Sequence, residues 1–187
     1  MTVSKNGSNL GDLVFELYSN HCPKTSDNFI QFATGNNKLG KSYAGTKIDG
    51  GFPGITVQGG KLGCENLAAD GIRMPDENLE LRHYKRGILT MNNDGENSNG
   101  SEFLITLGKS EMLNGYHVAF GELVEGDSVL SEIEESLTRQ GGVKADIKIE
   151  ASGTRWEWSI LNYLNLELKF LLESLSIFIS NIYGLNY

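Results

Sequence analysis

Glycine is the feature that most constrains the fold of this chain, because 22 of its 23 glycines fall within residues 1–154 and only Gly184 follows. Glycine adopts the positive φ angles that tight hairpins require, so glycines between short apolar runs predict many short strands. One run alternates with the period of a strand, with Leu13, Phe15 and Leu17 on one face. Similar runs lie at residues 88–91, 103–106, 118–120 and 147–149. We therefore expect a mainly β domain over residues 1–154.

Two segments have the period of a helix instead. Pro23 suits the first turn of a helix that Gly35 would end. Its apolar face would carry Phe29, Phe32 and Ala33. A second helix is predicted over residues 128–137, with Asp127 as its N-cap. Its buried face would carry Leu130, Ile133 and Leu137. Two short helices beside many strands suggest a barrel with covered ends.

Charge and cysteine content narrow the class of function. The chain has 16 Lys and Arg against 24 Asp and Glu, a net charge of −8, which argues against a nucleic-acid partner. Two cysteines and no apolar leader after Met1 indicate a reducing compartment, so we expect a cytoplasmic protein, with the nucleus as the alternative. The histidines and cysteines lack the paired spacings of a zinc site, and we expect neither a metal nor a cofactor.

Several motifs occur in an order and at a spacing that together point to one family. The longest are Pro-Lys-Thr-Ser-Asp-Asn-Phe at 23–29, Pro-Gly-Ile-Thr-Val-Gln-Gly-Gly at 53–60, and Gly-Ile-Leu-Thr-Met-Asn-Asn at 87–93 leading to Asn-Ser-Asn-Gly-Ser-Glu-Phe at 97–103. Shorter ones lie at 15–18, 32–35, 76–78 and 117–121. With these motifs, residues 1–153 resemble the cyclophilins.

The resemblance implies a closed eight-stranded antiparallel barrel capped by two helices. Such a domain binds proline-containing peptides in a surface groove and accelerates the cis-trans isomerisation of the X–Pro bond. The reaction changes no covalent bond and lowers a rotational barrier of ~18–20 kcal/mol. Its transition state loses amide resonance, so the site needs an apolar pocket for the proline ring and donors that hold the twisted amide. Proton-transfer residues are unnecessary.

The chain departs from the family at the arginine that is the chief donor. Counting back without a gap from Pro53 and Gln58, the position of that arginine is held by Gly50. Loss of one preorganised donor costs roughly 3 kcal/mol, or on the order of 10²–10³ in rate. Lys47 is near in sequence, but in an extended strand it would point to the face opposite position 50. We therefore identify no catalytic residue.

The residues that the resemblance assigns to peptide binding are partly altered. Ile55 and Thr56 stand where the family has Phe and Met, Leu104 stands for a second Phe, and Met112 stands for the Trp at the rim. Asn92 replaces a small residue, and Glu102 replaces a glutamine. Five positions match: Gln58, Asn93, Phe103, Leu113 and His117. The strand context of Phe103 is that of a core residue. In this family, the residue at that position can both belong to the core and line the binding site.

Two hypotheses about function follow. The first is a prolyl-peptide-binding domain whose peptidyl-prolyl cis-trans isomerase activity is weak or lost. The second is an active isomerase that assists protein folding, with a substitute amide donor such as a backbone N–H near Asn92 and Asn93. Replacing Gly50 by arginine and measuring the isomerisation rate distinguishes the two hypotheses. In either case the expected partners are proline-containing peptides or proteins.

The two ends of the chain carry separate expectations. Only Met1 to Ser4 remain of the family's first strand, so that strand is expected to be truncated and its neighbour to be left partly unpaired. Residues 155–187 form an apolar C-terminal tail that is predicted to be helical, since its apolar residues recur in steps of three and four. The seam consists of Leu161, Leu164, Leu168, Leu171, Leu175, Phe178 and Ile182. Dimerisation or docking through the tail is the first reading, and membrane association is the second.

Overall fold

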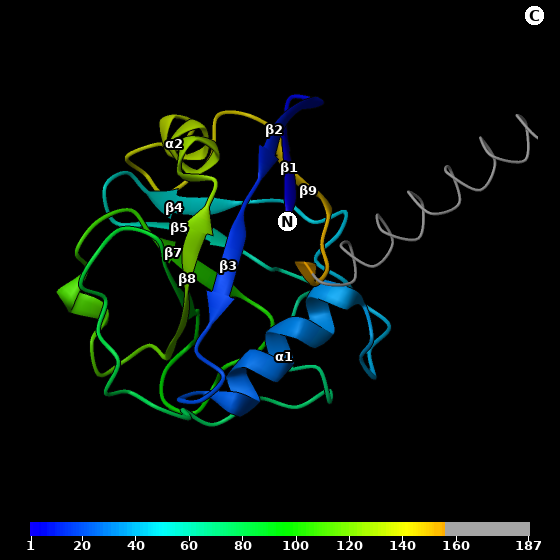
Figure 1. The fold of residues 1–187 in the computed structure, drawn as a ribbon, viewed down its shortest axis with the longest axis vertical. Helices are drawn as coiled ribbons and strands as arrows, with labels where there is room; N and C mark the ends of the chain where they lie inside the picture. Colours follow the sequence, from blue (N-terminus) through cyan, green and yellow to red (C-terminus); the bar gives the residue numbers. More distant parts are fainter. Residues whose placement is uncertain (156–187) are drawn as a thin grey trace, which may run out of the picture. The chain divides into compact units, whose positions relative to one another are not determined.

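The computed structural model describes residues 1–155. Within them, Met1–Ser152 form one compact unit of short strands and two α-helices (Figure 1). The strands are β1 (Thr2–Lys5), β2 (Ser8–Asp12), β3 (Val14–Leu17), β4 (Gly50–Phe52), β5 (Thr56–Gly59), β6 (Ile88–Met91), β7 (Phe103–Thr106), β8 (Ala119–Glu125) and β9 (Ile147–Ala151). The helices are α1 (Pro23–Thr34), α2 (Asp127–Glu135) and the short 3-10 helix η1 (Glu111–Leu113). The tail predicted from residue 155 onward lies, apart from its first residue, outside the described residues.

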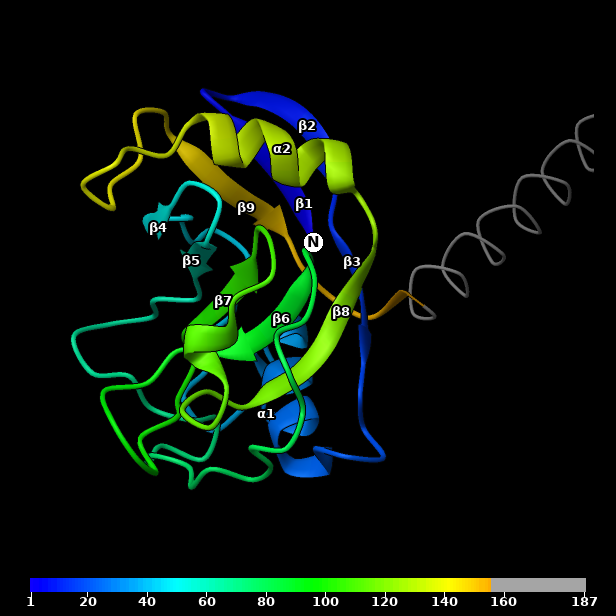
Figure 2. The same cartoon turned by 90° about the vertical axis from the view of Figure 1, so that its left-hand side faces the viewer.

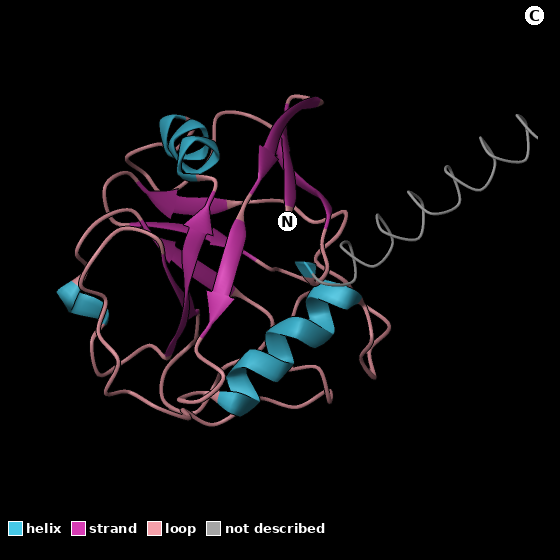
Figure 3. Ribbon diagram, viewed as in Figure 1, coloured by secondary structure: helices cyan, strands magenta, loops and turns pink. Residues whose placement is uncertain are grey.

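Within residues 1–155 all strand pairs are antiparallel, and they form sheets of order β2-β1-β9 and β3-β8-β6-β7-β5-β4. Figure 3 shows these strands in magenta and the helices in cyan. Only Leu13 separates β2 from β3, so one extended segment belongs to both sheets. On the other side, the residues before β4 bond to β9: the N–H of Ile48 donates to the carbonyl of Ile147 at 3.1 Å, and the N–H of Ile149 donates to the carbonyl of Thr46 at 2.9 Å. The hydrogen-bonded pairs thus connect eight extended segments in a ring, which is the arrangement of the predicted barrel.

The N-terminal residues complete this ring. β1 pairs with β2 on one side and with β9 on the other. Val3 and Ser4 of β1 are buried. The expectation that a truncated first strand leaves its neighbour unpaired is therefore wrong, because four residues suffice to form ladders with both neighbours.

The two helices lie at opposite ends of the strands in both views (Figures 1 and 2). α1 begins at Pro23 and ends at Gly35, whose φ of 76° is the left-handed conformation expected of a C-cap glycine. Its predicted apolar face is buried, as are Leu130 and Ile133 of α2. None of the helices in residues 1–155 is long and apolar enough to cross a membrane. These observations confirm a mainly β fold with two helices.

The predicted N-cap of α2 is wrong by one residue. Gly126 is the N-cap, with φ 102°, and a Cβ atom there would lie 2.1 Å from the carbonyl oxygen of Asp12. Only glycine fits so close an approach of two backbones. Asp127 is the first helical residue, and its carboxylate accepts a hydrogen bond from Nε of Arg86 at 2.7 Å.

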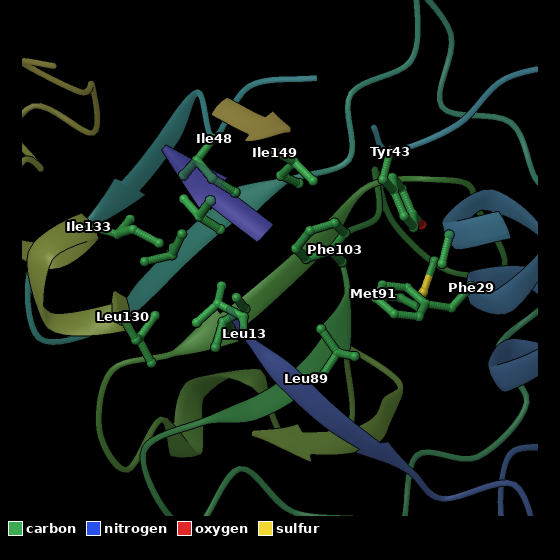
Figure 4. Close-up of a cluster of buried hydrophobic side chains, with 14 of the residues drawn as sticks. Leu13, Phe29, Tyr43, Ile48, Leu89, Met91, Phe103, Leu130, Ile133 and Ile149 are labelled. Atoms are coloured by element: carbon green, nitrogen blue, oxygen red, sulfur yellow. The ribbon is translucent and has the colours of Figure 1, made fainter. Parts of the chain in front are cut away.

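The core is aromatic toward α1 and aliphatic toward α2 (Figure 4). The ring of Phe29 lies 5.1 Å from that of Tyr43 and 5.5 Å from that of Phe103, measured between centroids. The hydroxyl of Tyr43 donates to the carbonyl of Ser101 at 2.8 Å, and complete burial raises the pKa of Tyr43. This aromatic cluster fixes α1 against the start of β7, next to the strands that carry the candidate site.

Candidate functional site

Gly50, in β4, is paired with Gln58 of β5 and is buried. A Cβ atom at Gly50 would lie 3.6 Å from Oε1 of Gln58 and 3.3 Å from the carbonyl oxygen of Gly141. Gly51 is more constrained, since it has a φ of 138° and a Cβ there would lie 2.3 Å from the carbonyl oxygen of Thr56. A side chain at position 50 would thus lie beside the Gln58 amide and close to the Gly141 carbonyl, but residue 50 has none.

The strand register extends this pair across four strands. Gln58 pairs with Leu104 of β7, and Leu104 pairs with Thr90 of β6. Paired residues share a face of an antiparallel sheet and successive residues alternate between faces. The residues on the opposite face, Val57, Leu89 and Ile105, are 0% exposed and belong to the core. We call this other side of the sheet the Gln58 face; it consists of Gly50, Thr56, Gln58, Thr90, Asn92, Glu102 and Leu104. Gln58, Asn92 and Glu102 are half-buried, and the other four are buried.

Glu102 connects the polar side chains of the Gln58 face. Its Oε2 accepts a hydrogen bond from Nε2 of Gln58 at 3.1 Å and one from Nδ2 of Asn92 at 2.9 Å. The backbone N–H of Glu102 donates to Oδ1 of buried Asn66 at 3.0 Å, and its carbonyl accepts the N–H of Asn92 at 2.9 Å. The amide nitrogen of Gln58 therefore lies at Glu102 while its oxygen lies beside Gly50. A carboxylate, not a guanidinium, holds the orientation of this amide.

Phe103 does not belong to this surface. Its side chain is 0% exposed and packs edge-on against Phe29 and Tyr43. Because it lies between Glu102 and Leu104 in an extended strand, it points to the opposite face from both. Its place among the candidate peptide-binding residues is corrected accordingly, and it is a core residue.

Two exposed apolar side chains lie at the margin of the predicted site. Met112, in η1, is 62% exposed and Ile55, in the turn between β4 and β5, is 37% exposed, whereas Leu113 is half-buried.

Two polar candidates, Asn93 and His117, are held by backbone carbonyls. The Asn93 side chain donates to the carbonyl of Tyr116 at 2.8 Å, and Nδ1 of His117 donates to the carbonyl of Met91 at 2.9 Å. In the neutral ring this leaves Nε2 of His117 as the acceptor.

Buried His83 holds the segment that carries η1, a role that the sequence did not indicate. Oδ1 of Asn114 accepts both the backbone N–H and Nδ1 of His83 at 2.9 Å, so Nδ1 carries the proton. Nε2 of His83 then accepts the hydroxyl of Thr90 at 3.0 Å. Burial, and to a lesser extent the nearby His117, lowers the pKa of His83 despite its bond to Asn114. A neutral His83 thus ties η1 to β6.

A second cluster, the Arg86 clamp, fixes the turn that carries Ile55. Oε1 of Glu134 accepts the N–H of Gly54 at 3.0 Å, and Oε2 of Glu134 lies 2.5 Å from Nη1 of Arg86. Arg86 also donates to Asp127, to the hydroxyl of Ser131 and to the carbonyl of Leu107. Leu107 in turn donates its N–H to the carbonyl of Ile55 at 2.9 Å. We define the clamp as Arg86, Asp127, Ser131 and Glu134; neither its residues nor their pairing was predicted from the sequence.

Other charged groups bear less directly on the site. The ammonium of Lys47 lies 2.5 Å from Oδ1 of Asp146, just before β9. Among residues 1–155, no group of three or more His, Cys, Asp or Glu side chains could hold a metal ion. The side chains of the Gln58 face offer hydrogen bonding, apolar contact and the charge of Glu102.

Comparisons with known proteins cover nearly all of the described residues. Residues 1–154 match the family model described as cyclophilin type peptidyl-prolyl cis-trans isomerase/CLD. Over 152 residues the chain is 40% identical to a peptidyl-prolyl cis-trans isomerase of Encephalitozoon cuniculi (strain GB-M1). This match covers 79% of the chain and 87% of that protein.

Proposed function

The chain belongs to the cyclophilin-type peptidyl-prolyl cis-trans isomerase family, and we propose that it binds proline-containing peptides on the Gln58 face with weak or no isomerase activity. The observation that carries the proposal is Gly50, which lies next to the amide of Gln58 and has no side chain to donate a hydrogen bond. The family as a whole acts on X–Pro bonds. At the position that we assign to the donor, this chain has Gly50.

The physical reason lies in the rotation of the amide. The X–Pro bond isomerises over a barrier of ~18–20 kcal/mol because twisting removes amide resonance. A preorganised donor that binds only the twisted form lowers this barrier, and its loss reduces the rate by roughly 10²–10³. Binding of the ground state depends less on such a donor. A site without it can therefore retain affinity for the peptide while losing turnover.

Several residues of the described region support retained binding. Ile55 and Met112, which are exposed at the margin of the Gln58 face, offer apolar contact for a proline ring, and Leu104, only 7% exposed, adds the small accessible part of its side chain. The Arg86 clamp holds the turn of Ile55, and His83 holds η1. These anchors keep the apolar groups in place without any ligand, which limits the entropy lost on binding.

One observation favours the alternative, an active isomerase with a substitute donor. The N–H of Asn92 is already used by the carbonyl of Glu102, at 2.9 Å. The N–H of Asn93 makes no hydrogen bond within residues 1–155, while its side chain is fixed by Tyr116. Of the two backbone donors considered, only that of Asn93 is available to a twisted amide.

The proposal is tested by titrating the full-length ¹⁵N-labelled protein with the peptide acetyl-Ala-Ala-Pro-Ala-amide and following the side-chain NH₂ signals. We expect saturable shifts at Gln58, Asn92 and Asn93, and none with the all-alanine peptide of the same length. Met112→Asp places a charge at the exposed apolar margin of the site and should abolish the shifts, while Val124→Asp, at an exposed position of β8, should not. If proline and alanine peptides act alike on the unmodified protein, the proposed function is wrong.

A further inference from the structure

We propose that Glu102 makes a basic residue beside the proline part of what this protein recognises. The inference rests on the proposed function, because it places the bound peptide on the Gln58 face. Glu102 itself is half-buried, and both its backbone groups are held by hydrogen bonds, to Asn66 and Asn92. Its carboxylate is therefore presented in a fixed position.

The charge of this carboxylate is not balanced by any cation in the described part of the chain. Its Oε2 is bonded only to the neutral amides of Gln58 and Asn92, and its Oε1 accepts no hydrogen bond from residues 1–155. The ion pairs of these residues do not include Glu102. A half-buried carboxylate interacts with a cation more strongly than a fully solvated one, because solvent screens the pair less.

Gly50 leaves a second acceptor next to this carboxylate. Oε1 of Gln58 lies 3.6 Å from where a Cβ of residue 50 would be, while the Nε2 of the same amide lies 3.1 Å from Glu102. Gln58 and Glu102 together thus offer two oxygen atoms, the Oε1 of each side chain, that accept no hydrogen bond from residues 1–155. Lysine and arginine side chains carry donors only, so they complement this pair.

The distances along the strand fit a basic residue close to proline. Glu102 and Leu104 are two residues apart, roughly 7 Å along an extended strand. Consecutive Cα atoms of a peptide are about 3.8 Å apart. With the proline ring against Leu104, a Lys or Arg one or two positions away therefore reaches Glu102. The net charge of −8 adds a general attraction for basic peptides, from which the specific contact must be separated.

The test compares the affinities of acetyl-Ala-Lys-Pro-Ala-amide, acetyl-Lys-Ala-Pro-Ala-amide, acetyl-Ala-Ala-Pro-Ala-amide and acetyl-Ala-Glu-Pro-Ala-amide for the full-length protein by NMR titration. We expect at least one lysine peptide to bind about 10-fold more tightly than the alanine peptide, and the glutamate peptide to bind most weakly. Glu102→Gln keeps the size and acceptor oxygen of the side chain and should reduce the lysine preference to about 2-fold or less. The control Glu135→Gln removes the same charge from the exposed face of α2 and should leave the preference unchanged.

The outcomes separate this inference from the function it rests on. If all four peptides bind equally well, the cation preference is wrong and the proposed function stands. If lysine is preferred equally by the unmodified protein and by Glu102→Gln, the preference comes from net charge and the assignment to Glu102 is wrong. If none of the peptides binds, both proposals are wrong.

Discussion

Glu134 and Glu102 each accept two hydrogen bonds, but from donors of different charge. Glu134 bonds to the guanidinium of Arg86 and to the N–H of Gly54, so its charge is balanced within the domain. Glu102 bonds to the amides of Gln58 and Asn92 and keeps its full negative charge. The same side-chain type thus does two things: in the Arg86 clamp it stabilises a turn, and on the Gln58 face it is available to a charged ligand.

The largest effect should come from giving the Gln58 face a cation of its own. Gly50→Arg restores the donor at a position where a Cβ has neighbours no closer than 3.3 Å. We expect X–Pro isomerisation to become faster by roughly 10²–10³. The arginine should also abolish the preference for lysine peptides, since it pairs with Glu102. The rate is measured by exchange NMR on an Ala-Pro peptide.

Ser8→Arg is the matched control for this change, because it adds the same charge at an exposed position of β2. It should leave the isomerisation rate as it is. A folded Gly50→Arg protein that turns over no faster than the unmodified one would show that the missing arginine is not what limits catalysis.

Breaking the Arg86 clamp should reduce stability instead. Arg86→Met leaves Glu134 and Asp127 without their cation and leaves the Leu107 carbonyl and the Ser131 hydroxyl without a donor. Loss of such charge-assisted bonds at a partly buried site costs about 2 kcal/mol of unfolding free energy. Urea unfolding measures this difference. Lys109→Met removes the exposed ion pair with Glu111 and should have no measurable effect; equal losses in the two variants would contradict the comparison.

Glu77 is intermediate between Glu102 and Glu134. Like Glu102, it accepts hydrogen bonds from neutral donors, and like Glu134, it has a structural role. It accepts the N–H groups of Lys24 and Thr25 and the hydroxyl of Thr25 at the start of α1, at 3.0, 2.7 and 2.8 Å. Burial alone would raise the pKa of Glu77, but these hydrogen bonds to the charged form outweigh it and lower the pKa below its usual value. We expect Glu77→Gln to cost about 1 kcal/mol at pH 7.

The pH dependence of that loss follows from the direction of the shift. Because the folded-state pKa of Glu77 is lowered, its contribution is complete above the unfolded-state pKa of roughly 4.3 and disappears as the pH falls through the folded-state value. The difference in unfolding free energy between the two proteins should therefore be complete at pH 7 and should shrink steadily as the pH is lowered below about 4.3. A difference independent of pH would mean that the side chain acts through packing, and exposed Glu80→Gln serves as the control.

Local sequence signals predicted much of the fold. Pro23 and Gly35 mark the two ends of α1, and the runs at 88–91 and 103–106 coincide with β6 and β7. The sequence reading missed β4, since Gly50-Gly51-Phe52 has no apolar alternation and becomes a strand only by pairing with β5. Aspartate is a favoured cap, which predicts Asp127 as the N-cap of α2, but the close approach of Asp12 to Gly126 makes Gly126 the N-cap.

The sequence predicted which residues belong to the candidate site, but it did not predict the contacts among them. The motifs brought Gln58 and Glu102 into one candidate list, but the hydrogen bond between them spans 44 residues of sequence, and no local pattern encodes it. The same holds for Arg86 and Glu134, which are 48 residues apart. The strand context of Phe103, between Glu102 and Leu104, predicted a core position, and its edge-on contacts with Phe29 and Tyr43 agree with that prediction.

The central claim is that Gly50 separates binding from turnover. It is tested most directly by two-dimensional exchange NMR on acetyl-Ala-Ala-Pro-Ala-amide at a concentration of full-length protein that saturates the shift changes. We expect bound-state shifts together with cis-trans exchange that stays close to the uncatalysed time of tens of seconds. Exchange accelerated to the millisecond range in the unmodified protein would contradict the claim and would identify a working donor other than residue 50.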